Sequence, residues 1–256
     1  LREMYDYSRK LGIDCVSTPF SKKEVDFLVD ELDVPFIKIA SMDLNNYPFL
    51  EYIAKKDKPM VLSTGLSELY EIDKAIHTIE STGNDKLVIL HCVAIYPTPD
   101  ENVNLNNIDT LKKLYPYPIG FSDHTLGYSI PLASVAKGVC LIEKHFTLDK
   151  DMEGWDHKVS VTPDEMRIIV EESKRISKAM GSSRIISTED DIRKTEFRRS
   201  IVTTRNMKSG EIIKSSDLDA KRPGTGIPPD DLRYVTGRTL KNDVLEDEIL
   251  NWEDLV

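Results

Sequence analysis

The sequence predicts an α/β fold followed by a small β-rich domain. Short apolar runs alternate with amphipathic stretches from Leu1 to about Met180. Strands that alternate with helices in this way form parallel βαβ units, which define an α/β fold. Beyond about Glu196 the pattern changes to short strand-like and turn-like pieces, so a separate small domain follows.

Six candidate strands can be counted in the α/β part. An open, doubly wound sheet accommodates this number, whereas a closed eight-stranded barrel would need two more strands before Leu1. The pattern alone leaves both architectures open. The apolar runs are Asp14–Thr18, Phe36–Ala40, Met60–Ser63, Leu87–Cys92, Ile119–Ser122 and Val139–Lys144.

Two helices have clear start signals. Ser21 and Glu24 have capping-box spacing just ahead of apolar positions that recur at helical intervals. Thr162 is followed by a proline at the first helical position and by Glu165 at the third, which predicts a helix beginning at Pro163.

The domain boundaries follow changes in composition. The α/β domain is expected to span residues 1–181, and the β-rich domain residues 198–256. Residues 182–197 are polar and are predicted to form a linker with one short charged helix.

Composition and charge argue against several classes of protein. A net charge of −10 argues against a nucleic-acid partner, because binding to a phosphate backbone requires a basic face. No run approaches the roughly 18 apolar residues that span a bilayer, and the charged start Leu1–Tyr5 does not resemble a signal peptide. The cysteines, each in an apolar run, are interpreted as buried free thiols of a cytoplasmic protein. They are Cys15, Cys92 and Cys140.

Polar residues stand at the end of nearly every predicted strand. The active site of a parallel α/β fold is built from the loops at the carboxyl ends of its strands, so these residues are expected to share one rim. They are Ser41 and Asp43, Ser63 and Thr64, His91, Ser122 to His124, and Glu143 to His145.

Histidines are concentrated at this rim. His91, His124 and His145 fall at strand ends, and His157 follows in a turn. Imidazoles on separate strands can bind a first-row metal and leave positions open for water or substrate. Since no H-x-x-x-H or C-x-x-C spacing exists, a buried, hydrogen-bonded histidine is the alternative for each. His77 lies within a predicted helix and is interpreted as a surface or packing residue.

Two lysines, Lys38 and Lys144, lie within otherwise apolar strands. Such a position is costly unless the ammonium group meets an anion. One interpretation is a salt bridge across the interior to Glu143 or Asp43. The other is a phosphate or carboxylate subsite, completed by the hydroxyl groups of the rim.

Two acids at or near the rim, Asp123 and Asp156, are the best placed for proton transfer or for orienting a ligating histidine. For Asp156 a solvated turn carboxylate is the competing interpretation. In the small domain, Lys221–Gly226 is a basic loop in which a proline holds Arg222. An arginine on a rigid loop would suit a carboxylate or phosphate, but Pro-Gly is common turn chemistry and the residues alone favour an ordinary turn.

In order and spacing, these motifs resemble the sialic acid synthase family. The resemblance covers nearly the whole chain, from about Asp14 to the C-terminus. The loop at 221–226 is similar to the hallmark of the SAF (antifreeze-like) domain appended to the barrel of this family. The other motifs are Lys38–Ser41, Ser63–Gly65, Leu90–Cys92 with Tyr96–Pro99, Gly120–Thr125, Ile142–Leu148 and Gly154–His157.

The resemblance implies a (β/α)8 TIM-type barrel plus a small SAF domain. With six strands counted, the barrel would lack its first two β/α units, which in the family carry an acidic residue and a lysine of the active site. Because such a barrel has two open sheet edges, we expect this chain alone to be poorly active or inactive.

The resemblance also implies roles for individual residues. A divalent metal, Mn²⁺ or alternatively Mg²⁺, would be held by His124 and His145, and Asp156 would lie near the reacting sugar. Arg222 would reach from the SAF domain into the active site of the other subunit of a domain-swapped homodimer and contact the sugar. The residues implied for phosphoenolpyruvate binding are Lys38, Ser41, Ser63 and Ser122.

The family reaction is the expected activity. Phosphoenolpyruvate condenses with an N-acetylated hexosamine aldehyde, giving a nine-carbon 2-keto sugar acid and phosphate. Ala94 stands where sialic acid-forming members carry a polar residue that touches the sugar, and its methyl group donates no hydrogen bond. A diacetamido sugar, giving legionaminic or pseudaminic acid, is therefore the alternative acceptor.

Two rival functions are distinguishable by assay. A metal-dependent aldolase on a similar barrel would condense its substrates without releasing phosphate. An inactive fragment that only dimerises through its SAF domain would form no 2-keto acid.

Overall fold

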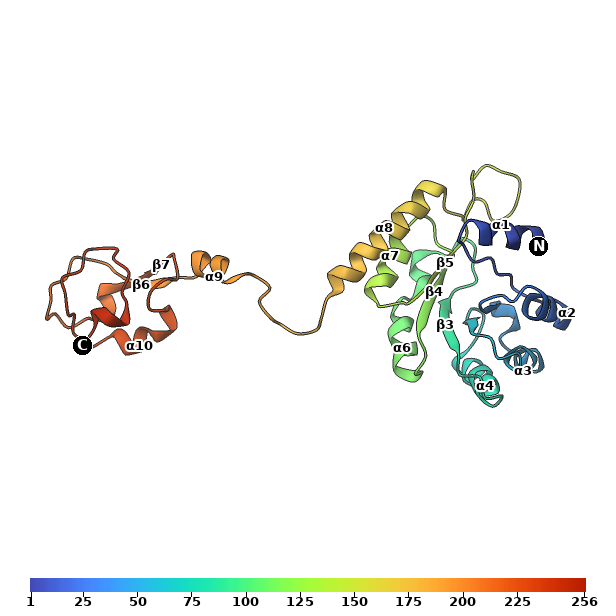
Figure 1. Ribbon diagram of the computed structural model, residues 1–256, viewed down its shortest axis with the longest axis horizontal. Coiled ribbons are helices and arrows are strands. Elements are labelled where there is room, and N and C mark those ends of the chain that lie inside the picture. The colour runs from blue at the N-terminus through green and yellow to red at the C-terminus, as the bar shows by residue number, and fades with distance from the viewer. The chain divides into compact units, whose positions relative to one another are not determined.

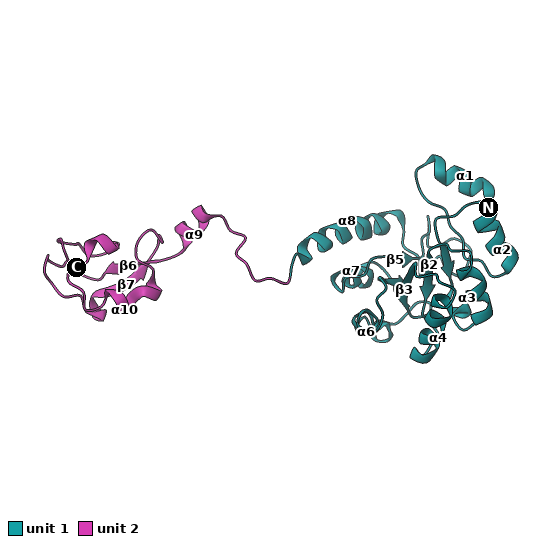
Figure 2. Cartoon of the chain, turned by 60° about the horizontal axis from the view of Figure 1, so that its bottom comes forward, with its two compact units in different colours: residues 1–182 teal, residues 183–256 magenta.

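The chain consists of two compact units. The computed structural model describes residues 1–256. Unit 1 spans Leu1–Ser182 and unit 2 spans Ser183–Val256 (Figure 2).

Five parallel strands form the centre of unit 1 (Figure 1). They lie side by side in chain order, like successive strands of a β/α barrel and unlike an open sheet whose order reverses at a switch point. The prediction of a barrel-type α/β fold is therefore confirmed. The strands are β1 (Ile37–Ile39), β2 (Met60–Ser63), β3 (Leu87–Cys92), β4 (Ile119–Asp123) and β5 (Ile142–Lys144).

Helices follow the strands and pack around the sheet (Figure 1). None of them is both long and apolar enough to cross a lipid bilayer. A π-helical turn, Phe27–Glu31, extends α2, and a 3-10 turn, Ser41–Asp43, follows β1. The helices are α1 (Arg2–Lys10), α2 (Lys22–Asp26), α3 (Tyr47–Ala54), α4 (Leu69–Glu80), α5 (Asp100–Val103), α6 (Asn106–Leu114), α7 (Ser129–Ala136) and α8 (Pro163–Met180).

Both predicted helix starts are confirmed. The Ser21 hydroxyl accepts a hydrogen bond from the backbone N–H of Glu24, and the Glu24 carboxylate accepts one from the N–H of Phe20. At α8, Thr162 and Glu165 form a reciprocal capping box with a proline in the first turn. These caps satisfy N–H groups that would otherwise have no partner at the helix ends.

The strand predicted at Asp14–Thr18 is wrong. This segment forms no ladder with β1, which pairs only with β2 and is an edge of the sheet. An apolar run becomes a strand where a neighbour completes its backbone hydrogen bonds, and no neighbour does so here. The run predicted at Val139–Lys144 forms a strand only over Ile142–Lys144, because its three residues are the ones that pair with β4.

Side chains alternate between the two faces of the sheet. Ile37 and Ile39 of β1 are buried in the apolar layer beneath the helices, as are Leu87 and Ile89 of β3. Because the side-chain period of a strand is two, Lys38 lies on the opposite face, toward the interior of the curled sheet. The same alternation divides the polar residues at the strand ends between the two faces.

The prediction of free thiols is confirmed, but their burial is not uniform. Cys92 is buried, Cys15 is partly exposed and Cys140 is exposed. Cys140 lies just before β5, which has a neighbouring strand only on its β4 side, and the prediction that it is buried is therefore wrong.

Unit 2 is small and contains a two-stranded antiparallel sheet, β6 (Ser200–Thr203) and β7 (Leu218–Lys221). Isolated bridges, such as Met207 with Val244, join its loops. Its short helices are α9 (Asp191–Phe197) and α10 (Leu232–Val235), with 3-10 turns at Ser215–Asp217, Pro229–Asp231 and Trp252–Asp254. Its own core consists of Ile201, Met207, Ile213, Ile227, Val235, Leu240, Val244, Leu250 and Leu255.

Candidate active site

The carboxyl ends of the strands bring most of the predicted site residues together in unit 1. A pocket of about 240 Å³ opens between the two edges of the sheet, β1 and β5. Such a position is where parallel α/β folds place their active sites. The pocket is lined by Thr18, Lys38, Ser122, Asp123, His124, Glu143, Lys144 and His145.

A chain of polar contacts centred on Lys38 crosses the interior. The Lys38 ammonium donates to the Ser63 hydroxyl at 2.8 Å and lies 3.5 Å from the carboxylate of Glu143. Ser122 donates to the other oxygen of this carboxylate at 2.7 Å. The lysine is 12% exposed and Glu143 41% exposed, so the cluster is in contact with solvent. The predicted salt bridge with Glu143 exists, and the same geometry leaves an ammonium group and two hydroxyl groups at one opening.

Ser41 lies next to this cluster rather than inside it. Its hydroxyl accepts a hydrogen bond from the backbone N–H of Gly65 at 3.1 Å and lies 3.6 Å from the Cys92 sulfur. A side chain at Gly65 would come within 2.7 Å of this hydroxyl, so only glycine permits the approach. Burial raises the pKa of the Cys92 thiol, which keeps it neutral beside Ser41 and Ser122.

The imidazoles of His124 and His145 form a pair, with ring centroids 5.3 Å apart. Nδ1 of His124 lies 2.8 Å from the carbonyl oxygen of Val93. Since a carbonyl can only accept, Nδ1 carries the proton and Nε2 keeps a free lone pair. Burial lowers the pKa of His124, which favours the neutral ring that binds metals.

Tyr96 packs against both histidines, with its ring centroid 4.1 Å from His124 and 5.6 Å from His145. The sequence reasoning assigned it no role. The available signal was an aromatic side chain four residues beyond the end of β3, at the same rim. Its contact with both rings restricts the side on which a ligand can approach them.

Asp156 lies beside the histidine pair but is open to solvent. Its carboxylate is 3.7 Å from Nδ1 of His145 and is 62% exposed. This distance is too long for a hydrogen bond, so the carboxylate is free to meet a ligand.

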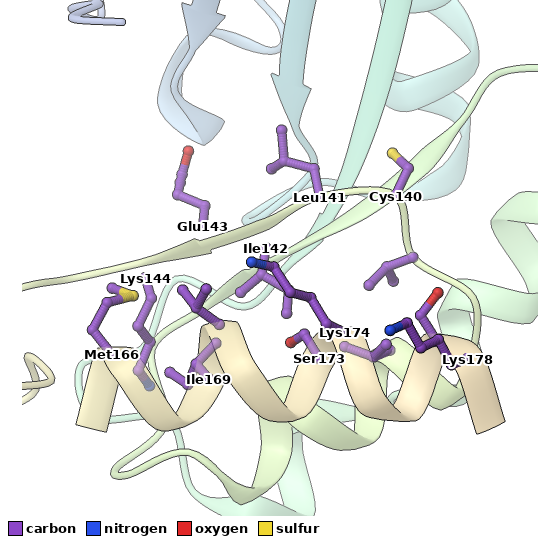
Figure 3. A pocket seen from close by; sticks show the side chains of 14 residues that line it. Cys140, Leu141, Ile142, Glu143, Lys144, Met166, Ile169, Ser173, Lys174 and Lys178 are labelled. Atoms are coloured by element: carbon purple, nitrogen blue, oxygen red, sulfur yellow. The ribbon is translucent and has the colours of Figure 1, made fainter. Parts of the chain in front are cut away.

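Lys144 and Asp123 form a sealed ion pair 2.6 Å apart, and their side chains are 1% and 0% exposed. Figure 3 shows Glu143 and Lys144 on opposite sides of β5, with Lys144 on the side of α8. A groove of about 790 Å³ between β5 and α8 lies on that side. Lys144 therefore has a structural partner, which is neither of the two acids predicted for it, and it does not belong to the open cluster.

The remaining histidines of unit 1 have other partners. His91 is buried, contacts the Val103 carbonyl through Nε2 at 2.7 Å and stacks on Phe121, and burial lowers its pKa. His157 contacts the Thr147 hydroxyl at 2.7 Å. His77 is exposed on α4, as predicted. The metal interpretation is thus restricted to His124 and His145.

Arg222 of unit 2 is exposed on a well-braced loop. Ser200 donates to the Pro223 carbonyl at 2.7 Å and accepts from the N–H of Gly226 at 2.8 Å. The guanidinium group lies 5.2 Å from the ring centroid of Phe197. The loop is therefore a turn, as its residues predict, and it also presents an arginine to solvent.

Another pocket, of about 640 Å³ and larger than the one beside Lys38, lies between the loops that follow β2 and β3. Cys92 lines it and also contacts Ser41, so it borders the Lys38 cluster. Ala94 and Ile95 form part of its apolar wall, and Ser67 and Asn107 are among its polar groups. The sequence analysis singled out Thr64, His91, Cys92 and Ala94 among its lining residues, but not those from α4 and α6, which are remote in sequence.

Comparison with known proteins shows that the chain belongs to the NeuB family. The NeuB family model matches residues 1–185 and the SAF domain model matches residues 198–256. An uncharacterized protein of Methanocaldococcus jannaschii is 46% identical over 256 residues, which are 99% of this chain and 75% of that protein.

Two further relatives have descriptive names. The N,N'-diacetyllegionaminic acid synthase of Campylobacter jejuni is 37% identical over 97% of this chain and 75% of its own length. A crystal structure of N-acetylneuraminic acid (sialic acid) synthetase from Leptospira borgpetersenii superposes with a TM-score of 0.71 at 35% identity, covering 75% of this chain and 67% of that one. The resemblance to the sialic acid synthase family is thereby confirmed.

Proposed function

We propose that this chain condenses phosphoenolpyruvate with an N-acetylated hexosamine aldehyde to a nine-carbon 2-keto sugar acid and releases phosphate. The observation that carries the proposal is that two half-sites, the Lys38 cluster and the His124–His145 pair, line one pocket at the rim. Membership of the NeuB family supports the same transferase activity.

The Lys38 cluster is the phosphoenolpyruvate subsite in this proposal. Lys38 and the hydroxyl groups of Ser63 and Ser122 are donors that can exchange their present partners for phosphate oxygens. Ser41, one step away, is the further donor for the carboxylate end of the substrate. Fixed donors in a partly desolvated site stabilise the charge of the departing phosphate.

His124 and His145 are the proposed metal ligands, for Mn²⁺ or alternatively Mg²⁺. His124 fits this role because its free Nε2 belongs to a neutral ring. No group of three or more His, Cys, Asp and Glu side chains is placed so that it could hold a metal ion, so the protein would supply two imidazoles and leave other positions to water and substrate. When bound, the ion would act as a Lewis acid on the aldehyde oxygen of the sugar.

The side chains of the rim position the reactants. The enol carbon of phosphoenolpyruvate attacks the aldehyde, and water adds to the carbon that bears the phosphate ester. Loss of phosphate then leaves the 2-keto acid. Asp156, exposed and beside His145, is the proposed group that exchanges a proton with the sugar.

A diacetamido hexose is a second candidate acceptor. Ala94 contributes a methyl group to the wall of the 640 Å³ pocket, where a second acyl group would find apolar contacts. The Campylobacter relative, an N,N'-diacetyllegionaminic acid synthase, supports this second candidate.

A homodimer in which Arg222 contacts the sugar of the other subunit is part of the proposal. The loops after the strands expose large apolar side chains, a pattern typical of a surface that another chain covers. Arg222 on its braced loop would supply a charged contact. Free thiols in a biosynthetic enzyme support a cytoplasmic location. The exposed side chains are Met42, Leu66, Ile95, Tyr96, Leu126, Phe146, Leu148 and Trp155.

One assay tests the reaction. The chain is incubated with Mn²⁺, phosphoenolpyruvate and a panel of mono- and diacetamido hexoses, and phosphate and 2-keto acid are measured. We expect equal amounts of the two products, formed slowly because the five-stranded sheet has two open edges, and loss of both in His124→Ala and His145→Ala but not in His157→Ala. A 2-keto acid formed without phosphate would identify an aldolase instead. Turnover that survives both histidine substitutions would contradict the proposed site.

A further inference from the structure

We infer that the buried Lys144–Asp123 pair is a positioning device for His124, and that it sets the affinity of the histidine pair for a metal ion. The inference rests on the metal site of the proposed function and assigns a role to two residues outside the open cluster. The hydrogen bonds of these two side chains go to each other and to Thr125 rather than to the imidazoles, so both act through the backbone beside His124.

The register of the sheet places the two residues side by side. Asp123 and Lys144 are direct partners in the ladder between β4 and β5, and Ser122 and Glu143 are the preceding pair. His124 and His145 follow each of them by one residue. All four residues line the same pocket, and the ion pair directly precedes the histidine pair on both strands.

The ion pair fixes the turn that contains His124. The Asp123 carboxylate accepts from the backbone N–H of Thr125 at 2.9 Å and from its hydroxyl at 3.2 Å. Lys144 donates to the carbonyl oxygen of Thr125 as well as to Asp123. The backbone of Thr125 is thus tied to Asp123 at the end of β4 through its N–H, and to Lys144 of β5 through its carbonyl group.

The other side of His124 is tied to the loop after β3. The ring nitrogen Nδ1 contacts the Val93 carbonyl, and the His124 carbonyl accepts from the N–H of Thr98 at 3.0 Å. These contacts set the ring orientation, but they lie on a loop. The Lys144–Asp123 pair connects the turn to the strand that immediately precedes His145, and so it fixes the two rings relative to each other.

The chemistry of the pair agrees with this role. A fully buried ion pair adds little net stability over apolar side chains of similar shape, because desolvation offsets the attraction. A function in positioning explains why such a pair stands between the two proposed ligands. Groups that orient metal ligands without touching the ion typically change metal affinity by about 10- to 100-fold.

The test uses the full chain and Mn²⁺ alone. Asp123→Asn is combined with Lys144→Met, which removes both charges and leaves no buried ion without a partner. The dissociation constant for Mn²⁺ is measured by electron paramagnetic resonance at a temperature at which melting curves show both proteins folded. We expect binding weaker by about 10- to 100-fold. Binding of inorganic phosphate, which involves Lys38, should stay within about twofold of the wild type because Lys38 and Ser122 have hydrogen-bond partners other than this ion pair.

Two controls make the outcome decisive. Lys86→Met removes an exposed ion pair with Asp57 on the same unit and should leave the Mn²⁺ affinity unchanged. Lys144→Arg, which keeps the charge beside Asp123, should retain most of the wild-type affinity. If the folded double variant binds Mn²⁺ as tightly as the wild type, the positioning role is wrong. If the wild type itself binds none, the proposed metal site fails and this role fails with it.

Discussion

Lys38 and Lys144 both lie within apolar strands in the sequence, but they differ in the structure in solvent exposure and in their ion-pair partners. Lys38 lies at the open cluster, 3.5 Å from a carboxylate that is 41% exposed. Lys144 is sealed against Asp123 at 2.6 Å, and neither side chain has contact with solvent. The difference shows that an ammonium group in an apolar strand serves a ligand only where its partner can be exchanged.

The histidines divide by their partners rather than by burial, since His91 and His124 are both buried. His124 and His145 face each other in the pocket at the rim, whereas Nε2 of His91 already contacts the Val103 carbonyl and its ring stacks on Phe121. Polar groups whose partner can be exchanged for a ligand are therefore assigned to substrate and metal binding. Polar groups with a fixed, buried partner are assigned to structure. The experiments below separate the two kinds.

The largest difference between the two lysines is expected in the free energy of unfolding. Lys144→Met leaves the Asp123 carboxylate buried without its counter-ion and should lower the free energy of unfolding by about 3–5 kcal/mol. Lys38→Met leaves Glu143 in contact with water and should cost less than about 1 kcal/mol. Urea unfolding of both variants measures the contrast, and equal losses would contradict the division into sealed and open pairs.

For ligand binding, the larger effect is expected from Lys38 and not from Lys144. Lys38→Met removes a charged donor and should weaken phosphoenolpyruvate binding by about 1.5–3 kcal/mol, the usual range for a hydrogen bond to a charged group. Calorimetric titration measures it, with Lys86→Met as the matched control on an exposed ion pair. An unchanged affinity in Lys38→Met would place the phosphate elsewhere.

The buried His91 should contribute to the pH dependence of the free energy of unfolding. Burial lowers the pKa of His91 below the value of 6.5 that it has in the unfolded chain. The unfolded state therefore binds more protons, and the free energy of unfolding falls as the pH is lowered through this region. His91→Asn, which keeps a donor for Val103, should reduce the slope by up to about 1.4 kcal/mol per pH unit.

The smallest expected effect concerns the choice of acceptor. Ala94→Asn adds a donor to the wall of the larger pocket and removes apolar contact. One hydrogen bond is worth about 0.5–1.5 kcal/mol, so the ratio of turnover on monoacetylated and diacetylated sugars should rise by up to about tenfold. A fall in this ratio would contradict the position assigned to the acyl group.

Much of the fold was predictable because strand and helix periods, caps and the alternation of elements are local properties. The wrong strand at Asp14–Thr18 shows the limit, since pairing depends on a neighbour that periodicity does not reveal. The same applies to Cys140, whose exposure follows from the absence of a strand beside β5.

The position of the candidate site at the carboxyl ends of the strands was predictable from the sequence. Strand ends placed Lys38, Ser63, Ser122 and the two histidines together, and the pocket contains or borders all of them. Which lysine is open could not be predicted, because the register that pairs Asp123 with Lys144 is set by packing across two strands. The contacts of Tyr96 depend on the path of a loop and could not be predicted from the sequence either.

The central claim is that the Lys38 cluster and the histidine pair form one site. The most direct measurement is the broadening by Mn²⁺ of the ³¹P resonance of phosphoenolpyruvate bound to the full chain. We expect strong broadening in the wild type and in His157→Ala, and its loss in His124→Ala, His145→Ala and Lys38→Met. Broadening that persists unchanged in all three of the last variants would show that metal and phosphate meet elsewhere, and would contradict the account.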